Sequence, residues 1–175
     1  DDCAVLTIPQ GFELCVSTDT LIEGVHFPKN ANPELVSRRA IGANLSDLAA
    51  MGAKPHAMTL ALTMPSTDHP WLKAFSAENN RLCELYEVPI IGGNLARGSL
   101  SVTLNVMGLV PAGAGLLRST ARQGDGIYVS GALGAAAGAV HQLSAEQIDG
   151  ELFVSYSSPT PRLQFGQGLL GIATA

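Results

Sequence analysis

Residues 13–27 read ELCVSTDTLIEGVHF, and the first half of this stretch predicts a short strand with polar groups at its end. The apolar residues 14–16 favour a buried strand, because side chains of this kind pack well on a pleated surface. Ser17, Thr18 and Asp19 then add two hydroxyls and a carboxylate, from which a buried strand gains little. The stretch therefore indicates either a capped turn or a group of side chains that binds a ligand.

The composition predicts a globular protein. The chain has 175 residues, of which 46% are hydrophobic, so it can form the core of one ordinary domain, or of a small domain and part of another. Its formal net charge is -5 and it has no run of lysine or arginine, which disfavours nucleic acid and anionic membrane as partners. It also lacks an apolar run of roughly 18 residues and a signal peptide, so we expect no membrane partner.

The cysteines and the chain ends add two expectations. Cys3, Cys15 and Cys83 are odd in number, far apart and without a CxxC pair, which disfavours a disulfide framework or a zinc site. A reducing compartment fits best, so we expect a cytoplasmic protein. The chain starts at Asp1 without methionine and stops in the apolar segment GLLGIATA, which leads us to expect a fragment of a longer protein.

Hydrophobic periodicity predicts strands and helices that interleave along the chain. Strands are expected at residues 3–8, 13–18, 57–64, 89–93, 99–110 and 125–131. Helices are expected at residues 33–53 and 70–87, whereas residues 134–143 indicate either a helix of small residues or a flexible loop. A turn at residues 111–115 marks a domain boundary. The predicted fold class is therefore mixed α+β.

Asp47 and Asn94 extend the set of polar side chains. Asp47 lies in a helix otherwise filled with alanine, leucine and methionine, where a buried carboxylate is costly without a partner and a cation would offset that cost. Asn94 follows two glycines at the end of a predicted strand. Carboxylate, hydroxyl and amide oxygens are ligands that Mg²⁺ prefers, and the sequence has no P-loop motif, so a metal ion would have to bind any phosphate groups.

Each of these polar groups also has an ordinary structural explanation, which the residues alone leave open. Asp1 and Asp2 could be frayed terminal residues, and residues 17–20 could form a hydrogen-bonded turn. The cap of a restarting helix could explain Asn44, Ser46 and Asp47. His26 could be a packed or surface histidine, and residues 92–93 could form only a turn.

Taken together, several stretches resemble one known family in their order and spacing. They are DDCAVL, STDTLIEGVHF, NLSDLAAMGAKP, LALTMP, IIGGNLARGSLSVTLNVMG and RSTARQGDGIYVSG. The chain is similar over essentially its whole length to the thiamine-monophosphate kinase family, which belongs to the superfamily of aminoimidazole ribonucleotide synthetase. The resemblance implies that residues 1–110 form a dimerising domain that binds metal and ATP, with a sheet that pairs across a homodimer into a β-barrel. It implies that residues 111–175 begin an α/β C-terminal domain.

The resemblance also implies an activity. The family transfers the terminal phosphoryl group of ATP to thiamine monophosphate, which gives thiamine diphosphate and ADP. An acceptor that is already an ionised phosphate needs little help from a general base, so we expect no catalytic base. Catalysis then consists of aligning two anions and neutralising their charge with Mg²⁺.

Site residues are implied by matching positions in the family motifs. The Mg²⁺ ligands implied in this way are Asp2, Ser17, Thr18, Asp19, Asp47 and Asn94. The ATP-binding positions implied are Gly93, Asn94 and Arg118. The position of His26 contacts thiamine phosphate in the family.

Two features depart from the family pattern and keep alternatives open. The family carries Asp where this chain has Asn94, and an amide oxygen brings no negative charge to a metal site. The chain also stops where the family continues, so the fragment alone is expected to be inactive. The alternatives are another ATP-dependent member of the superfamily, such as aminoimidazole ribonucleotide synthetase or selenophosphate synthetase, and a catalytically silent module for dimerisation or metal binding.

Overall fold

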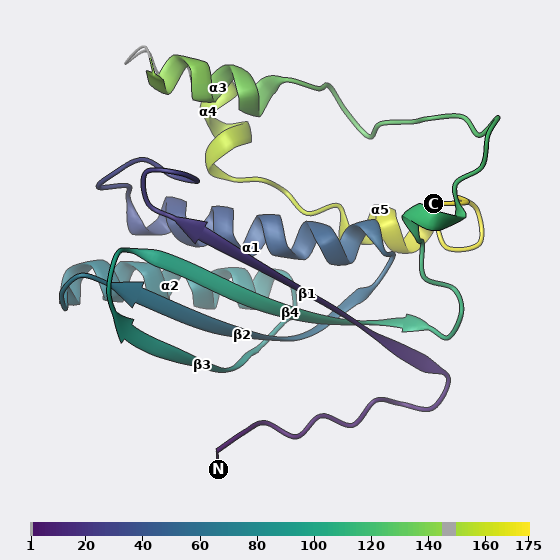
Figure 1. Cartoon of the computed structure of the whole chain (residues 1–175), viewed down its shortest axis with the longest axis horizontal. Helices are drawn as coiled ribbons and strands as arrows, with labels where there is room; N and C mark the ends of the chain where they lie inside the picture. The colour runs from purple at the N-terminus through teal and green to yellow at the C-terminus, as the bar shows by residue number, and fades with distance from the viewer. Residues whose placement is uncertain (1, 145–149) are drawn as a thin grey trace.

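The computed structural model describes residues 2–144 and 150–175, and its centre is a four-stranded sheet in the order β1-β4-β2-β3 (Figure 1). Along the chain, the sheet and its helices are β1 (Phe12–Ile22), α1 (Pro33–Ala50), β2 (Lys54–Met64), α2 (His69–Leu85), β3 (Ile90–Arg97) and β4 (Ser101–Pro111). They are followed by η1 (Arg118–Thr120), α3 (Ala135–Ser144), α4 (Gly150–Ser157) and α5 (Leu163–Gly168). The mixed α+β class is thereby confirmed.

The pairing of the strands leaves two edges. β4 pairs antiparallel with β1 and with β2, whereas β2 pairs parallel with β3. A parallel pair needs a crossover connection, and α2 provides it between β2 and β3. β1 and β3 therefore form the two edges of the sheet.

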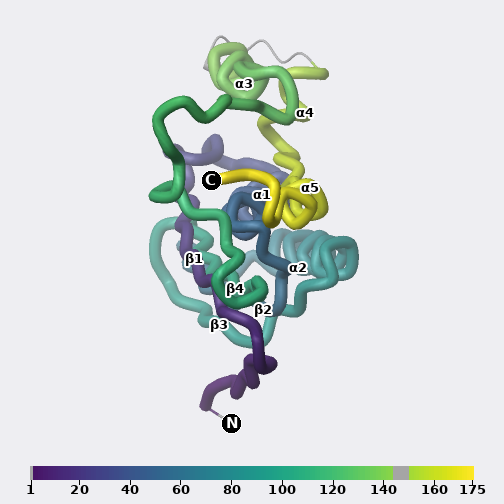
Figure 2. The backbone as a smooth tube through the Cα atoms, turned by 90° about the vertical axis from the view of Figure 1, so that its right-hand side faces the viewer, coloured from purple at the N-terminus to yellow at the C-terminus, as the bar shows by residue number. Residues whose placement is uncertain are grey.

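The side chains of β4 alternate between a buried face and a half-buried face. Val102, Leu104 and Val106 are fully buried, whereas Thr103 and Asn105 between them are half-buried. The buried side chains share one core with α1 and α2, and Figure 2 shows both helices on the same side of the sheet. The helices contribute Val36, Ile41, Leu45, Leu48, Phe75 and Leu82 to this core. The period of two in this strand thus reflects one face packed against helices.

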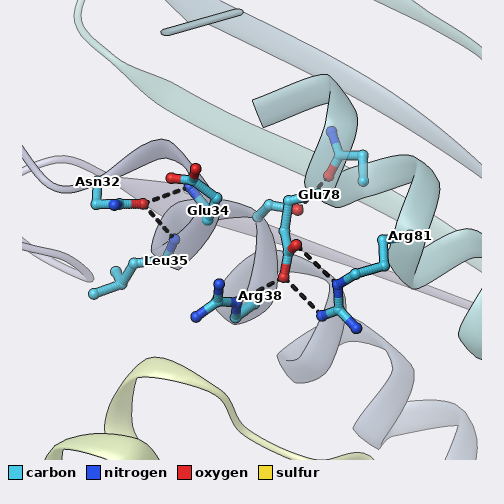
Figure 3. Close-up of polar contacts among 8 residues, drawn as sticks. Asn32, Glu34, Leu35, Arg38, Glu78 and Arg81 are labelled. Carbon is cyan, nitrogen blue, oxygen red and sulfur yellow. Dashed lines mark hydrogen bonds and ion pairs between the residues drawn. The ribbon is translucent and has the colours of Figure 1, made fainter. Parts of the chain in front are cut away.

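α1 and α2 share a polar contact inside their interface (Figure 3). Glu78 of α2 is only 7% exposed, and Arg38 of α1 donates from Nε to its carboxylate at 2.6 Å. Arg81 of α2 donates to both oxygens of the same carboxylate, at 2.9 and 2.7 Å. Beside them, Ser37 donates to the side-chain oxygen of Asn79 at 2.6 Å. The buried carboxylate therefore has partners on both helices.

The C-terminal segment lies against α1 at two glycines. A Cβ atom on Gly42 would lie 2.3 Å from the carbonyl oxygen of Pro159. A Cβ atom on Gly166 would lie 1.9 Å from the carbonyl oxygen of Ala49. Both distances are far below van der Waals contact, so this packing requires glycine at the two positions. α5 consequently lies directly on the backbone of α1 (Figure 1).

Most predicted elements are confirmed, with shifts of a few residues at their ends. Residues 13–18, 33–53, 57–64, 70–87, 89–93 and 99–110 correspond to β1, α1, β2, α2, β3 and β4. For residues 134–143 the helical alternative holds, because all but Gly134 belong to α3. The helices α4 and α5 were not predicted, because eight and six residues are too few to show a clear helical period.

Two predicted strands are wrong. Residues 3–8 and 125–131 have β-branched and apolar residues, but neither segment forms a strand. Val5 is 88% exposed and Ile127 is 96% exposed, so the other described residues cover little of either side chain. A strand is stabilised by a paired neighbour and a packed face, and local composition supplies neither.

The prediction for the opening stretch also needs correction. β1 continues to Ile22, so Ser17 and Asp19 lie within the strand rather than at its end. Leu14 and Val16 are 39% and 56% exposed, which contradicts the expectation of a buried strand. They lie on the outer face of an edge strand, which no helix of the described residues covers.

Two findings concern the expectations from composition. Cys3, Cys15 and Cys83 are free thiols. Burial is the main cause that raises the pKa of Cys15 and of Cys83. Across residues 2–144 and 150–175, no helix has both the length and the apolar composition that crossing a bilayer requires.

We predict that Glu78 makes the fold sensitive to acid. The hydrogen bond from Arg81, helped by Arg38 and opposed by burial, lowers the pKa of Glu78 to about 2. A carboxylate with a lowered folded pKa stabilises the protein above its unfolded pKa, here near 4.5, and this stabilisation is lost as the pH falls toward 2. Glu78→Gln should lower the free energy of unfolding by about 1–3 kcal/mol near neutral pH. It should also flatten the dependence of that free energy on pH in the acid range.

Urea denaturation followed by circular dichroism at several pH values measures both effects. Glu84→Gln is the matched control, because Glu84 is an exposed glutamate of the same helix. If the free energy of unfolding depends on pH equally in the two variants, Glu78 makes no special contribution to stability in acid.

Candidate functional site

β1 and α1 bring two pairs of polar residues together. Ser17 and Asp19 are two apart in a strand, so they lie on the same face of β1. Asn44 and Asp47 are three apart in a helix, so they are neighbours on one side of α1. Ser17 donates from Oγ to Oδ2 of Asp47 at 2.6 Å, and the main-chain N–H of Asp19 donates to Oδ1 of Asn44 at 3.1 Å. Strand and helix are thus joined by two hydrogen bonds at the place where the sequence predicted a site.

Asn44 is the connecting residue that the sequence interpretation missed. Its side chain is fully buried, and its Nδ2 donates to the carbonyl of Ala40 at 2.9 Å while its Oδ1 accepts from Asp19. α1 runs without a break from Pro33 to Ala50, so the alternative that Asn44, Ser46 and Asp47 cap a restarting helix is wrong. An amide side chain three residues before Asp47, on the same side of the helix, is the sequence signal that could have indicated the role of Asn44.

A cavity of about 830 Å³ opens beside this contact. It lies between β1, α1 and the C-terminal segment, and its polar side chains include Ser17, Asp47, Arg118 and Arg162. Its apolar wall includes Leu48, Met51, Leu116, Phe165 and Leu169. Two guanidinium groups beside a large apolar wall suit a ligand that has both an anionic part and a flat apolar part. Arg162, which precedes α5, was not predicted from the sequence, because no local motif marks it.

The short helix η1 that carries Arg118 is fixed by threonines. The hydroxyl of Thr120 lies within hydrogen-bond distance of the carbonyls of Leu117 and Thr174, which share its single hydrogen. Thr174 donates in turn to a carboxylate oxygen of Asp125 at 2.7 Å. Hydrogen bonds from Thr174 and from the main chain of Arg122 lower the pKa of Asp125. This network holds the loop from which Arg118 reaches the cavity.

His26 lies in the loop between β1 and α1. The main-chain N–H of Ile22 donates to Nδ1 of the imidazole at 3.0 Å. Because an N–H group can only donate, Nδ1 is the acceptor and the neutral ring carries its hydrogen on Nε2. The side chain is exposed, so this Nε2–H is available to an anionic ligand.

Thr18 and Asn94 lie elsewhere on the sheet. The hydroxyl of Thr18 accepts from Nδ2 of Asn105 at 2.6 Å, on the face that α1 does not cover. Asn94 pairs with Ala61 in the middle of β3, so the expectation that it follows a strand end is wrong. β1 and β3 are opposite edges, three strand spacings or about 14 Å apart. One chain therefore does not bring Asn94 to the contact between Ser17 and Asp47.

Gly93 has a packing role in this structure. A Cβ atom at this position would lie 1.9 Å from the carbonyl oxygen of Leu60 on the neighbouring strand. The close approach of β2 and β3 therefore requires glycine, whatever else binds nearby. A role of Gly93 in binding ATP stays a prediction.

Asp2 is exposed and lies apart from the other predicted metal ligands. Both Figure 1 and Figure 2 show the segment before β1 running beyond the sheet, away from α1, which carries Asp47. Asp1 lies outside the described residues. Within residues 2–144 and 150–175, no three side chains of His, Cys, Asp or Glu are grouped so that they could hold a metal ion.

The oxygen atoms near the cavity nevertheless suit Mg²⁺. This ion is usually held by one or two carboxylates together with the phosphates of a substrate, rather than by a cage of protein ligands. Ser17 and Asp47 supply a hydroxyl and a carboxylate at the cavity, and Asp19 adds a carboxylate on the same face of β1 as Ser17. The donor set therefore fits Mg²⁺ that arrives with a phosphate ligand.

Comparison with known proteins identifies relatives over the whole chain. Residues 1–110 match the family described as AIR synthase related protein, N-terminal domain. The chain is 45% identical to a thiamine-monophosphate kinase of Salmonella typhimurium, over 100% of this chain and 56% of that protein. The crystal structure of a thiamine-monophosphate kinase from Stenotrophomonas maltophilia, 37% identical, aligns with a TM-score of 0.94 over 100% of this chain and 58% of the other. The structure of AaThiL complexed with AMPPCP and TMP, 28% identical, aligns with a TM-score of 0.88 over 97% of this chain and 56% of the other.

The chain thus spans little more than half the length of these relatives. A protein that carries this sequence at the full length of its relatives is called the full-length protein below.

We predict that Asn44 stabilises the contact between β1 and α1. Asn44→Leu keeps a similar volume but leaves the N–H of Asp19 without its acceptor, which should lower the free energy of unfolding by about 1–3 kcal/mol. The amide of Asp19 should also exchange its hydrogen faster, because local opening of β1 becomes easier. Hydrogen exchange and urea denaturation of the full-length protein measure the two effects. Asn80→Leu, at an exposed position of α2, is the control, and unchanged exchange at Asp19 would contradict the role of Asn44.

Proposed function

Because the chain belongs to the AIR synthase related family, we propose that it is the nucleotide- and metal-binding part of a kinase that phosphorylates thiamine monophosphate with ATP. The observation that carries this proposal is the similarity of the whole chain to thiamine-monophosphate kinases. A relative that aligns over 97% of the chain has been solved with AMPPCP, an analogue of ATP, and TMP. In the proposed reaction, the bond between the β–γ bridging oxygen of ATP and the γ-phosphorus breaks, a phosphate oxygen of thiamine monophosphate forms a new bond to that phosphorus, and ADP leaves.

The residues of the cavity supply alignment and positive charge. The acceptor is an ionised phosphate, so the reaction needs little general-base catalysis and depends on bringing two anions into line. Arg118 and Arg162 lie at the same cavity and would bind phosphate oxygens of ATP. The apolar wall around Met51 and Phe165 would receive the adenine base. Gly93 and Asn94 remain proposed contacts of the nucleotide.

The carboxylates beside the cavity would hold Mg²⁺. Ser17 orients the carboxylate of Asp47, and Asn44 fixes the main chain at Asp19, so one carboxylate and the strand that carries the other are positioned before any ligand arrives. When bound, Mg²⁺ neutralises charge on the phosphates and favours transfer of the phosphoryl group. Thr18, Asp2 and Asn94 are proposed as further ligands on the basis of the family resemblance.

The uncovered face and edges of the sheet support a homodimer. Phe12, Leu14 and Val16 of β1 are 44%, 39% and 56% exposed. A strand edge with apolar side chains is a liability unless another chain covers it. We propose that a second copy pairs with this sheet to close a β-barrel from residues 1–110, and that residues 111–175 begin a second domain. In such a dimer, the β3 edge of one subunit can lie beside the β1 edge of the other.

The proposed dimer would bring Asn94 of one subunit to the β1 edge of the other. Within one chain, Asn94 and Thr18 lie on opposite edge strands of the sheet. If β3 of the second subunit lies beside β1, its Asn94 reaches the neighbourhood of Thr18 and Asp19. In this proposal the metal site is shared between subunits, and one chain holds only part of its ligands.

A catalytically silent module is the second candidate. The observation that favours it is Asn94, which brings no charge to the proposed metal site.

We also propose that the protein is located in the cytoplasm, on the basis of its three unpaired cysteines.

We predict that the full-length protein forms ADP and thiamine diphosphate from ATP and thiamine monophosphate, and that this activity requires Mg²⁺. Asp47→Asn should reduce turnover by about a hundredfold or more, because a charged oxygen ligand is lost. Thermal stability should change little, because an amide oxygen can still accept from Ser17. Coupled detection of ADP and chromatography of the product measure turnover. Glu84→Gln, outside the cavity, is the control, and normal turnover with a large loss of stability in Asp47→Asn would show a purely structural role.

We further predict that Asn94→Asp strengthens the binding of Mg²⁺. A charged oxygen replaces a neutral one, so the Mg²⁺ concentration that gives half-maximal activity should fall. Turnover that appears only in the variant would instead identify the natural protein as a silent relative. Asn80→Asp on α2 controls for the added charge. If neither Mg²⁺ dependence nor turnover changes, Asn94 does not face the metal ion.

A further inference from the structure

The carbonyl oxygen of His26 is held by two side chains from different parts of the chain. Arg39 of α1 donates to it from Nε at 3.1 Å. Tyr156 of α4 donates to it from its hydroxyl at 3.2 Å. The loop after β1 is therefore attached both to the central helix and to a helix that follows more than a hundred residues later.

Arg39 and Tyr156 also fix each other. The guanidinium carbon of Arg39 lies 3.9 Å from the centroid of the Tyr156 ring, which is a favourable cation–π geometry. Nη1 of Arg39 donates to the main-chain carbonyl of Tyr156. Tyr156 is 5% exposed, and its ring packs at 6.1 Å from that of Phe153. Both donors thus approach the carbonyl of His26 from side chains that are themselves held in place.

The imidazole of His26 is fixed from the other side. Its Nδ1 accepts from Ile22, and its own main-chain N–H donates to the carbonyl of Ile22 at 2.9 Å. The next residue, Phe27, is 2% exposed and anchors the loop in the core. Main chain and ring are therefore both restrained, and Nε2–H points from a rigid loop at an exposed position. Such a donor binds an anion with little loss of side-chain freedom.

We propose that Arg39 and Tyr156 are positioning residues, which hold His26 so that its Nε2–H donates to the phosphate of thiamine monophosphate. The proposal rests on the proposed function and adds two residues to it that touch neither substrate. Because Tyr156 belongs to α4, one of the two donors to the carbonyl of His26 is in place only when α4 is packed against α1. Binding of thiamine monophosphate is in this way coupled to the packing of residues 150–157 on the domain formed by residues 1–110.

Steady-state kinetics of the full-length protein separate this role from simple packing. Tyr156→Phe removes one hydroxyl but keeps the ring over Arg39, so the fold should be retained. We expect the KM for thiamine monophosphate to rise about fivefold, as for the loss of one hydrogen bond, with kcat and the KM for ATP unchanged. Arg39→Lys keeps the charge but loses the Nε donor, and should act in the same direction. Tyr86→Phe, at a half-buried tyrosine outside the loop, is the matched control.

A double-mutant cycle with His26→Ala shows whether the effect passes through His26. In the His26→Ala background, Tyr156→Phe should have no further effect on the KM for thiamine monophosphate. A persisting effect, an equal rise of both KM values, or a fall in thermal stability without any change in KM would each overturn the proposal while leaving the proposed function intact. Absence of turnover in the wild-type protein would overturn both together, so the two failures are distinguishable. If Tyr156→Phe does not fold, Arg39→Lys decides the same outcomes.

Discussion

The site depends on the hydrogen bonds of one buried side-chain amide, that of Asn44. β1 is an edge strand, so the N–H of Asp19 has no partner strand on its outer side and would be left unsatisfied against the helix. Asn44 accepts this hydrogen and donates one of its own to the carbonyl of Ala40, so both the oxygen and the nitrogen of the buried amide have a partner. The contact fixes how far β1 lies from α1. It therefore fixes the distance between the main-chain segments that carry Asp19 and Asp47.

α1 carries most of the other contacts that define the structure. One side packs on the buried face of β4, and Arg38 connects a second side to Glu78 of α2. A third side receives the C-terminal segment at Gly42 and Gly166, where backbone meets backbone. The cavity that we assign to ATP forms between this segment and β1, so its shape is set by the same helix that presents Asp47.

The sequence predicts the parts of the fold that follow from local pattern. The alternation in β4 and the long periods of α1 and α2 reveal elements that bury one face, and the polar residues of β1 indicate the site. Contacts between distant residues are not visible in this way. Tyr156 reaches His26 across 130 positions, and Arg162 joins the cavity only after the chain has folded back on α1. The sequence predicts that the strand ends before Asn94, because Gly and Asn disfavour strands, but parallel pairing with β2 overrides that preference.

The many roles of α1 have a consequence for how this protein can change over evolution. An α-helix turns by about 100° per residue, so one inserted or deleted residue rotates everything beyond it by that angle. Between Arg39 and Asn44, such a change would turn Asp47 away from Ser17, while Arg39 would still donate to the carbonyl of His26. Sequence drift in this helix is therefore confined to replacements. Changes in length must accumulate in the loops.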